Sequence, residues 1–476
     1  KDLTVNANAI ATFAYAGSNA FDGTLVNDGT IAINSGATLD VAGAYNSTTA
    51  PTAGTWNIGL KRTGGTSTAG LFTSAGALDF SVDTAHIVVE ASSQPLTAGQ
   101  VINNVLTGAS VTTFSAAPTD NSYLYDFTLT DIGVDNDLDL TVTTGNSMAS
   151  TATTSGNLAA GTALQTTLAA STDATINSLQ GALGAASTAA AVNDALELAQ
   201  PAVDGSSVVG ALAATTEVQG LTDTRMASLR SGDNSMSGMA AGASGNGVNM
   251  WVQGYGQSAI QDLSGGIDGY DSTTFGGAVG VDTGGLSNGV IGLAFNYGQT
   301  NADSKNATTT ATTVDSYGGT LYGNTNLGEQ RFLSGQLGYA YNDVSTDRHN
   351  TAGAGTVSHG STNSDQYSAK ATLGSDYAAD FGTTLTPTLS AAYTYIDTAG
   401  YTETGNGALL TFGSDTLNVL NLGVGLKTGW KFKDSDGSML KPQLHIGYAY
   451  DALGDKVELT NSLVNSGSIA NSFTST

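Results

Sequence analysis

The C-terminal half of the chain alternates between apolar and small or polar residues, in short runs that end at Gly, Asn, Asp or Ser. Successive side chains of a β-strand point to opposite faces, so such a run predicts a strand with one apolar and one polar face. The segment 420–433 is the clearest case. Its apolar row is Leu420, Leu422, Val424, Leu426, Trp430 and Phe432. Its other row is Asn421, Gly423, Gly425, Lys427, Gly429, Lys431 and Lys433.

Other segments between residues 248 and 476 repeat this division. Their apolar rows often end in Tyr or Trp, and their opposite rows are rich in Gly, Ala and Thr. An apolar exterior around a polar interior, with aromatic residues at both interfaces, is what a bilayer requires of a β-barrel. We therefore predict a membrane barrel; the alternative is a soluble antiparallel sandwich that buries the apolar rows. The lipid side is assigned Leu293, Phe295, Leu420, Leu422, Leu426, Trp430, Leu444 and Tyr448, and the lumen Lys370, Lys427, Lys431, Lys441 and His445.

Residues 1–150 form a second region, in which short strands with little charge alternate with turns. Glycine recurs at near-regular spacing, at Gly23, Gly29, Gly36 and Gly43. Apolar residues lie between these turns, at Leu25, Ile31, Ile33, Leu39 and Val41. Such a period predicts the coils of a parallel β-helix, each burying its apolar positions against the next. An ordinary β-sandwich is the alternative, and the longer runs 98–106 and 123–129 are expected to cap the solenoid.

Residues 151–247 are rich in Ala and Ser and contain no aromatic residue. Helix is favoured over 190–198 and 217–230, and in the second segment apolar residues recur at helical spacing. A helix this short and weakly apolar is unstable alone in water, so it needs a surrounding wall. The Gly- and Ser-rich stretch 231–247 predicts a flexible lead-in to the strands.

Composition narrows the possible functions. The chain has 476 residues, with 14 basic against 40 acidic residues and a formal net charge of −26. A surface that binds nucleic acid needs clusters of Lys and Arg, so we expect no nucleic-acid partner. The absence of Cys excludes disulfides and thiolate metal sites. No apolar run reaches 18 residues, so we expect no transmembrane helix.

The order of several short motifs resembles the autotransporter family (type V secretion) of Gram-negative outer membranes. Trp251-Val-Gln-Gly-Tyr-Gly is similar to the family's opening barrel strand, and Gly269-Tyr-Asp with Gly276-Gly-Ala-Val-Gly-Val-Asp282 is similar to the second. Further motifs follow in the family's order, at Asp347-Arg-His, Gly400-Tyr-Thr-Glu403 and Asn421-Leu-Gly-Val-Gly-Leu426. No single motif is specific, but their order and spacing together are, and the resemblance covers most of the chain.

The resemblance implies an all-β protein that carries its own passenger across the outer membrane and anchors it at the cell surface, without a cofactor or chemistry of its own. Residues 1–150 would be the end of a β-helical passenger, with the segment that helps it fold near 100–140. Residues 151–247 would be a linker with a helix at about 215–230 that threads the lumen, and 248–476 most of a twelve-stranded barrel. The implied lumen-helix residues are Glu217, Val218, Gln219, Gly220, Leu221, Asp223, Arg225 and Leu229. Independently of the resemblance, the lumen lysines are expected to pair with Glu217 or Asp223; the alternative is that they lie near the strand ends and are hydrated.

The resemblance also implies partners: outer-membrane lipid and lipopolysaccharide, the barrel-assembly machinery, and periplasmic chaperones. Acidic surface loops would hold divalent cations shared with lipopolysaccharide. Self-association or a surface ligand of the passenger is a further expectation.

Two features depart from the family pattern. Some members release the passenger by cyclising an Asn in the lumen helix, but Gln219 and Gly220 occupy those positions here. A six-membered imide closes more slowly than a succinimide, so we predict no self-cleavage by that route. The sequence also ends as 469–473 begins a tenth strand, before the family's closing strands. Open edges are unstable in lipid, so we expect either a fragment or a partner chain that supplies the edge.

Candidate chemistry is sparse. The histidines are His86, His349, His359 and His445, and they are widely separated in sequence. The segments 265–271 and 135–139 have some carboxylates in common with calcium loops, but solvated turns explain both better. We therefore expect no catalytic, cofactor or metal site. The functions left open are an adhesin whose β-helix binds host, matrix or neighbouring cells, a carrier of an enzymatic domain located before Lys1, and a passive channel.

Overall fold

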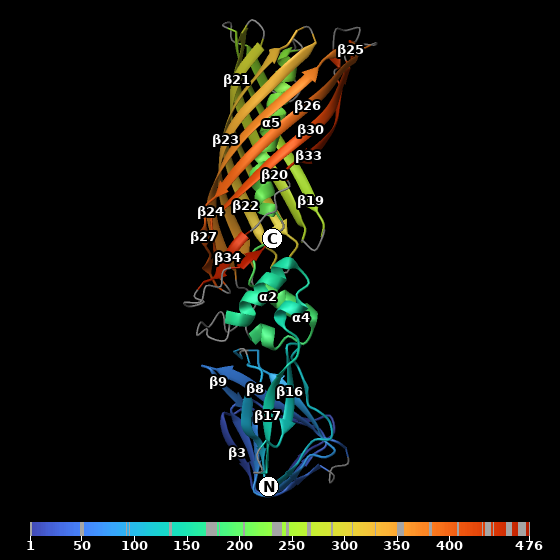
Figure 1. Cartoon of the computed structure of the whole chain (residues 1–476), viewed down its shortest axis with the longest axis vertical. Coiled ribbons are helices and arrows are strands. Elements are labelled where there is room, and N and C mark those ends of the chain that lie inside the picture. The colour runs from blue at the N-terminus through green and yellow to red at the C-terminus, as the bar shows by residue number, and fades with distance from the viewer. Residues whose placement is uncertain are drawn as a thin grey trace.

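In the computed structural model the chain is elongated, with a strand-rich body at the N-terminal end, a group of helices in the middle and a large curved sheet at the other end (Figure 1). The description that follows covers the whole chain except residues 1, 48–51, 92, 95, 133–135, 168–178, 180, 203–204, 231–239, 244–246, 264–267, 287–288, 307, 329, 350–356, 380–382, 407–408, 431, 434–438, 441, 454–458, 465–472 and 476.

The N-terminal body is a parallel solenoid, as the glycine period predicted. Its strands are β1 (Leu3–Val5), β2 (Ile10–Phe13), β3 (Gly17–Phe21), β4 (Leu25–Asn27), β5 (Thr30–Ile33), β6 (Ala37–Val41), β7 (Tyr45–Asn46), β8 (Thr55–Thr63), β9 (Thr66–Ala69), β10 (Leu71–Ser74), β11 (Ala77–Asp79), β12 (Thr84–Val89), β13 (Val101–Thr107), β14 (Ser110–Thr112), β15 (Thr119–Asp120), β16 (Tyr125–Thr130) and β17 (Asp137–Thr144). Successive strands enter different sheets, and most pair in parallel with the equivalent strand of the next coil, as in the orders β2–β5–β8–β12–β15 and β7–β11–β14.

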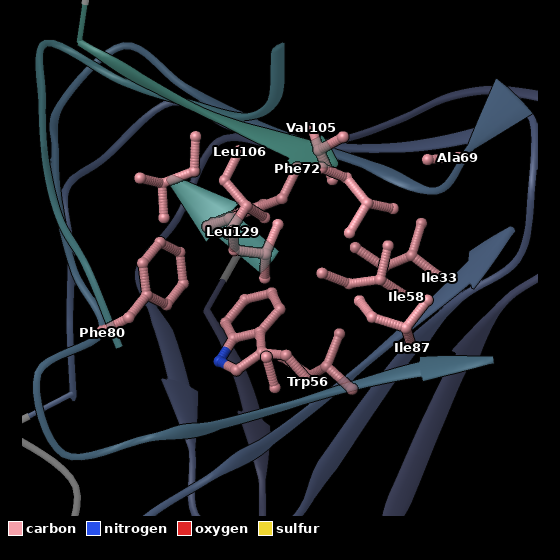
Figure 2. Close-up of a cluster of buried hydrophobic side chains, with 14 of the residues drawn as sticks. Ile33, Trp56, Ile58, Ala69, Phe72, Phe80, Ile87, Val105, Leu106 and Leu129 are labelled. Carbon is pink, nitrogen blue, oxygen red and sulfur yellow. The ribbon is translucent and has the colours of Figure 1, made fainter. Parts of the chain in front are cut away.

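The solenoid core is a column of inward side chains from successive coils (Figure 2). Trp56, Phe72 and Phe80 are fully buried, and their ring centroids lie 4.7–6.1 Å apart. Coils approach closely where glycine occurs: a Cβ on Gly70 would lie 2.1 Å from the carbonyl oxygen of Ile33. The runs predicted to cap the solenoid do so through a third strand, because β17 pairs antiparallel with both β13 and β16.

The middle segment holds more helix than the sequence predicted. Its helices are α1 (Met148–Thr151), α2 (Ser155–Thr167), α4 (Ala189–Glu197) and α5 (Ser206–Arg230). The prediction missed α1 and α2, whose sequences lack a clear apolar period, and it began the last helix at residue 217 although α5 begins at Ser206. Within the described part of the chain, no helix has both the length and the hydropathy that a membrane crossing needs.

The C-terminal body is one antiparallel sheet that curls around α5 (Figure 1). Its wall strands are β18 (Ala240–Ala243), β19 (Val248–Gln261), β20 (Tyr270–Leu286), β21 (Gly289–Ser304), β22 (Ala311–Asn326), β23 (Arg331–Arg348), β24 (Ser358–Ser375), β26 (Thr383–Thr398), β30 (Asp415–Trp430) and β33 (Gln443–Asp451), with β25 (Tyr377–Ala379) beside β26. Each pairs with its neighbour along the chain, and no pairing among the described residues joins β33 to β18.

One end of this sheet carries a smaller sheet of its own. It has the order β27 (Tyr401–Thr402), β29 (Leu410–Phe412), β34 (Leu459–Leu463) and β35 (Phe473–Ser475), while β28 (Thr404–Gly405) pairs with β24. The predicted tenth strand at 469–473 lies mostly outside the described residues, and β35 pairs with β34 rather than with the wall. A separate hairpin, β31 (Phe432–Lys433) with β32 (Met439–Leu440), follows β30.

Candidate functional site

The candidate site is the lumen of the curved sheet, which α5 occupies (Figure 1). At 1.5 Å per residue, the 25 residues of α5 span about 37 Å, enough to run through a membrane-spanning barrel. The helix is built from small residues, which let the wall approach closely. A Cβ on Gly210 would lie 2.8 Å from Cγ2 of Val314, and Ala214 lies against Gly298. This fit explains why the first half of α5 lacks an apolar stripe, because the wall surrounds it on several sides.

A buried ion pair fixes the second half of α5. The guanidinium of Arg225 donates from Nε to Oδ2 of Asp282 at 2.7 Å and from Nη2 to Oδ1 at 3.0 Å, and both side chains are fully buried. Asp282 also accepts from Asn249 and from the hydroxyl of Tyr322, each at 3.1 Å. The Tyr322 hydroxyl in turn accepts from the indole N–H of Trp251 at 2.7 Å. Residues of β19 and β22 thus hold Asp282 of β20, which binds the helix side chain.

A second polar group lies one turn earlier on α5. Gln336 of β23 accepts from the hydroxyl of Thr222 at 2.8 Å and donates to Asp223 at 2.7 Å and to the carbonyl of Gln219 at 3.2 Å. Lys370 of β24 donates to the other oxygen of Asp223 at 2.6 Å. These contacts depend on the rotation of the helix and on its position along the barrel axis. They therefore specify a single placement of α5 in the lumen.

The C-terminal end of α5 is held by different contacts. Asn324 donates to the carbonyl of Met226 at 3.2 Å. The guanidinium of Arg230 lies 3.4 Å from the ring centroid of Phe332, and its Nε lies 3.6 Å from a carboxylate oxygen of Asp376. A guanidinium over an aromatic face is attracted by the ring quadrupole. This end of α5 therefore lies beside the β22–β23 and β24–β26 connections.

The opposite face of the wall is apolar and points away from α5. Register carries the alternation across the sheet: Leu293 pairs with Leu321, which pairs with Leu337. The exposed members of this face include Leu293, Phe295, Leu422, Leu426, Leu444 and Tyr448, while Leu420 and Trp430 are half-buried. Leu293, Leu422 and Leu444 are 39–52% exposed and so do not form a dry interior. This is the inverse of a soluble fold.

The two ends of the wall differ in their connections. At one end the strands are joined by short segments, since β20 ends at Leu286 and β21 begins at Gly289, and β22 ends at Asn326 and β23 begins at Arg331. At the other end the segment between Thr398 and Asp415 is long and carries β27, β28 and β29. Bacterial outer-membrane barrels place short turns in the periplasm and long loops outside. The C-terminus of α5 lies at the short-turn end, so its N-terminus and the solenoid lie at the long-loop end.

Residues 250–476 match the family described as autotransporter beta-domain. This part of the chain is an autotransporter β-domain. The protein is accordingly an outer-membrane autotransporter of a Gram-negative bacterium. Among curated proteins, none matches the chain.

Two solved structures of other autotransporters are similar to this protein. One is the translocator domain of the autotransporter NalP from Neisseria meningitidis, with 18% identity and a TM-score of 0.40, over 54% of this chain and 87% of that one. The other is the beta domain of the Bordetella autotransporter BrkA, with 17% identity and a TM-score of 0.34, over 46% of this chain and 87% of that one. Assignment to the family rests on the match of residues 250–476.

The predicted lumen residues of the autotransporter occupy different surroundings. Of the lumen-helix residues, Val218, Gln219 and Arg225 are buried, Leu221 packs against the wall, Asp223 pairs with Lys370, and Gly220 is exposed. Leu229 and Glu217 are half-buried, and Glu217 forms no ion pair with any residue that the structure describes. The expected pairing therefore involves Asp223.

The remaining basic residues do not contact α5 in the same way. Lys427 of β30 and His445 of β33 are register partners on the lumen face. Within the described parts of the chain, neither forms an ion pair or a hydrogen bond to α5, and His445 is exposed. Lys431 and Lys441 lie outside the described residues.

Sequence reasoning missed the wall residues that hold the helix, chiefly Asp282, Tyr322 and Gln336. A signal was present, because a carboxylate or an amide inside an otherwise Gly-, Ala- and Thr-lined row faces the lumen and needs a partner. The predicted histidines form no cluster: His359 pairs with Asp347 on the surface, and His349 lies near the carbonyl of Thr309. Among the described residues, no group of three or more His, Asp or Glu side chains is placed to hold a metal ion.

Proposed function

We propose that this autotransporter carries its own N-terminal solenoid to the cell surface and then anchors it there through α5. The observation that supports the proposal most is the path of the chain. The solenoid joins the helices of the middle segment, these join the N-terminal end of α5 at the long-loop end, and α5 ends at the short-turn end. This is the path expected of a chain that has crossed the lumen from the periplasm to the outside.

The outer membrane offers neither ATP nor a proton gradient, so transport needs another source of direction. Folding of the passenger outside the cell would provide it. A solenoid coil with a core of Trp56, Phe72 and Phe80 is wide and close-packed. Returning it through a lumen that α5 already fills requires unfolding it and exposing that core to water. The transfer is therefore favoured in the outward direction.

The proposal includes partners on both sides of the membrane. The terminal wall strands β18 and β33 carry unpaired backbone groups along their outer edges among the described residues, and lipid does not satisfy such groups. We propose that the barrel-assembly machinery and periplasmic chaperones protect these edges and the unfolded passenger during assembly. Lipid and lipopolysaccharide would then surround the apolar face.

An epitope inserted at Gly64-Gly65 tests the direction of transport. Both glycines are in the left-handed region, with φ values of +59° and +83°, at the exposed turn between β8 and β9. The matched control carries the same epitope between Leu327 and Arg331, in a short turn at the opposite end of the wall. We expect antibodies to label the first variant on intact cells and the second only after permeabilisation. The reverse pattern would refute the proposal.

An adhesive passenger is the second candidate function. Exposed apolar side chains on the solenoid favour it, with Ile10 at 69% and Tyr15 at 72% exposure. Cells that display the intact protein should aggregate or bind matrix, and the double variant I10S/Y15S should reduce this without reducing display. An enzymatic passenger is the remaining alternative, and a catalytic constellation in the encoded sequence before Lys1 would support it.

A further inference from the structure

A guanidinium at the long-loop end of the barrel contacts the C-terminal end of α4. Arg348, the last residue of β23, donates from Nη1 to the carbonyl of Leu198 at 2.7 Å. Its Nε and Nη2 donate to the two carboxylate oxygens of Glu403 at 3.0 and 2.6 Å. Both side chains are 2% exposed. One side chain of the barrel therefore links a surface loop to the segment that precedes α5.

Glu403 also organises the loop on the barrel side. Its carboxylate accepts from the backbone N–H of Leu410 at 2.8 Å, and its own N–H donates to the carbonyl of Leu410 at 2.8 Å. This fixes β29, whose Leu410 and Phe412 are buried, and the ring of Phe412 stacks on Tyr401 at 4.4 Å. The loop thus presents a rigid apolar platform at the barrel mouth.

The helices of the middle segment rest on this platform. One apolar cluster contains Leu410 and Phe412 of the barrel together with buried side chains from the helices. The helical members include Met148, Ala160, Leu164, Leu183, Val192 and Leu196. Within the helices, Asn193 accepts from Asn157 at 2.8 Å and donates to the carbonyl of Thr151 at 3.0 Å, which holds α1, α2 and α4 together. The helices dock as a unit.

Electrostatics gives the ion pair a role in specificity. The last carbonyls of a helix carry partial negative charge and lack a partner within the helix, so a cation placed there is favourable. A buried ion pair adds little net stability, because desolvation offsets the attraction, but it penalises arrangements that leave either charge unpaired. Apolar burial drives the docking, and the Arg348–Glu403 pair determines where the C-terminal end of α4 lies on the barrel.

A cavity lies between the start of α5 and the wall, beside Arg348 and Glu403. It has a volume of about 110 Å³ and is lined by Ser206, Ala211, Arg348, Glu403 and Phe412, among others. We propose that α1, α2 and α4 form a lid that seals the outer mouth of the barrel, with Arg348 and Glu403 as its latch. This rests on the proposed orientation, in which the long loops face outward.

The chain has no Cys, so a single introduced thiol can report on the seal. A211C places it in the cavity, on α5, where Ala211 is 4% exposed. We expect a membrane-impermeant maleimide to label A211C slowly on intact cells. Adding R348Q should raise the labelling rate at least tenfold. The matched control K305A, which removes exposed ion pairs with Asp262 and Asp271 at the same end, should leave it within twofold.

The reversed pair R348E/E403R distinguishes two roles of the ion pair: holding the end of α4 on the barrel, and only stabilising the loop that carries Glu403. It restores an Arg–Glu pair but places a carboxylate beside the carbonyl of Leu198, so we expect labelling to stay fast. Slow labelling in the reversed pair would show that only the loop is braced. F412A, which weakens the platform without touching the ion pair, should also label fast.

The lid is refuted if R348Q and F412A both label at the rate of A211C alone. The epitope at Gly64-Gly65 is read in the same cells. Normal display with unchanged labelling rejects the lid and leaves the proposed function standing, whereas absent surface epitope rejects the orientation itself. If R348Q is not assembled, F412A decides the outcome.

Discussion

Arg225 and Asp282 are the most deeply buried oppositely charged pair in the described lumen, joined by two hydrogen bonds of 2.7 and 3.0 Å. They lie 57 residues apart in sequence, on α5 and on β20. Among the described residues the remaining Nη1 of Arg225 has no hydrogen-bond partner, so the pair is not optimised for stability alone. The pair determines the position of α5, because only one placement of the helix in the lumen brings both charges together.

Replacing Arg225 with Met should therefore loosen α5 strongly, because Asp282 would keep a buried charge without a counter-ion. Loss of one partner of a buried pair costs about 3–5 kcal/mol. Hydrogen exchange of the α5 amides measures the effect. K370A is the matched control, since Lys370 and Asp223 are partly exposed and such a pair contributes about 1 kcal/mol or less. Equal effects of the two variants would contradict this ranking.

Two glycines of α5 should respond in opposite ways to the same substitution. A Cβ on Gly210 would lie 2.8 Å from the side chain of Val314, whereas a Cβ on Gly220 meets no atom within 4 Å. G210A should therefore displace the helix from the wall. G220A should stabilise it by about 0.8–1 kcal/mol, because alanine has the higher helix propensity. Hydrogen exchange of α5 in the two variants tests the contrast, and faster exchange in G220A would count against it.

The passenger core contains a carboxyl whose titration should affect its stability. Asp83 is 1% exposed and accepts from Tyr45, from the Trp56 indole at 2.8 Å and from the Gly54 N–H at 2.8 Å. Burial raises the pKa of Asp83 above its ordinary value, although these hydrogen bonds act in the opposite direction. The native state therefore holds the proton more tightly than the unfolded chain.

It follows that Asp83 contributes stability below its unfolded-state pKa, which is about 3.9, and that this contribution is lost as the pH rises through the folded value. Urea unfolding followed by Trp56 fluorescence should give a higher midpoint at pH 4.5 than at pH 7.5. D83N should flatten that difference and so isolates the contribution of this carboxyl. A midpoint that rises with pH in the parent but not in D83N would reverse the sign assigned here.

Gln219 gives a prediction about processing. Its backbone lies inside α5, and its carbonyl accepts from the side-chain amide of Gln336 at 3.2 Å. Cyclisation would need the amide of Gln219 to attack its own backbone and the helix to open there. Mass spectrometry of the mature protein should show α5 uncut. A new N-terminus at Gly220 or Leu221 would overturn this prediction, and Q219A would then show whether the side chain was responsible.

The wall could be predicted from sequence because each strand has one apolar and one lumen face. Leu293 and Phe295 are outward while Ala294 between them is fully buried against the lumen, as a period of two requires. The solenoid was equally readable, since its inward positions recur once per coil. In both cases the pattern is local, and one residue's neighbours in sequence reveal its face.

The contacts of α5 could not be predicted in the same way. Its first half, from Ser206 to Thr216, carries small residues on all sides because the wall surrounds it, so no apolar stripe marks its start. The partners Asp282 and Gln336 lie 57 and 114 residues away from Arg225 and Thr222, respectively. Pairing over such separations depends on how the sheet curls, which no local pattern contains.

The account depends on the apolar row of the wall facing lipid while the lumen row encloses α5, and tryptophan quenching by lipids brominated in their acyl chains tests this directly. The variant W430F keeps Trp251, which is buried in the lumen, and Trp56, which is buried in the solenoid. Its fluorescence should be quenched little. Adding F295W, at an outward position 58% exposed, should introduce a strongly quenched component. Strong quenching of W430F, or none on adding F295W, would contradict the account.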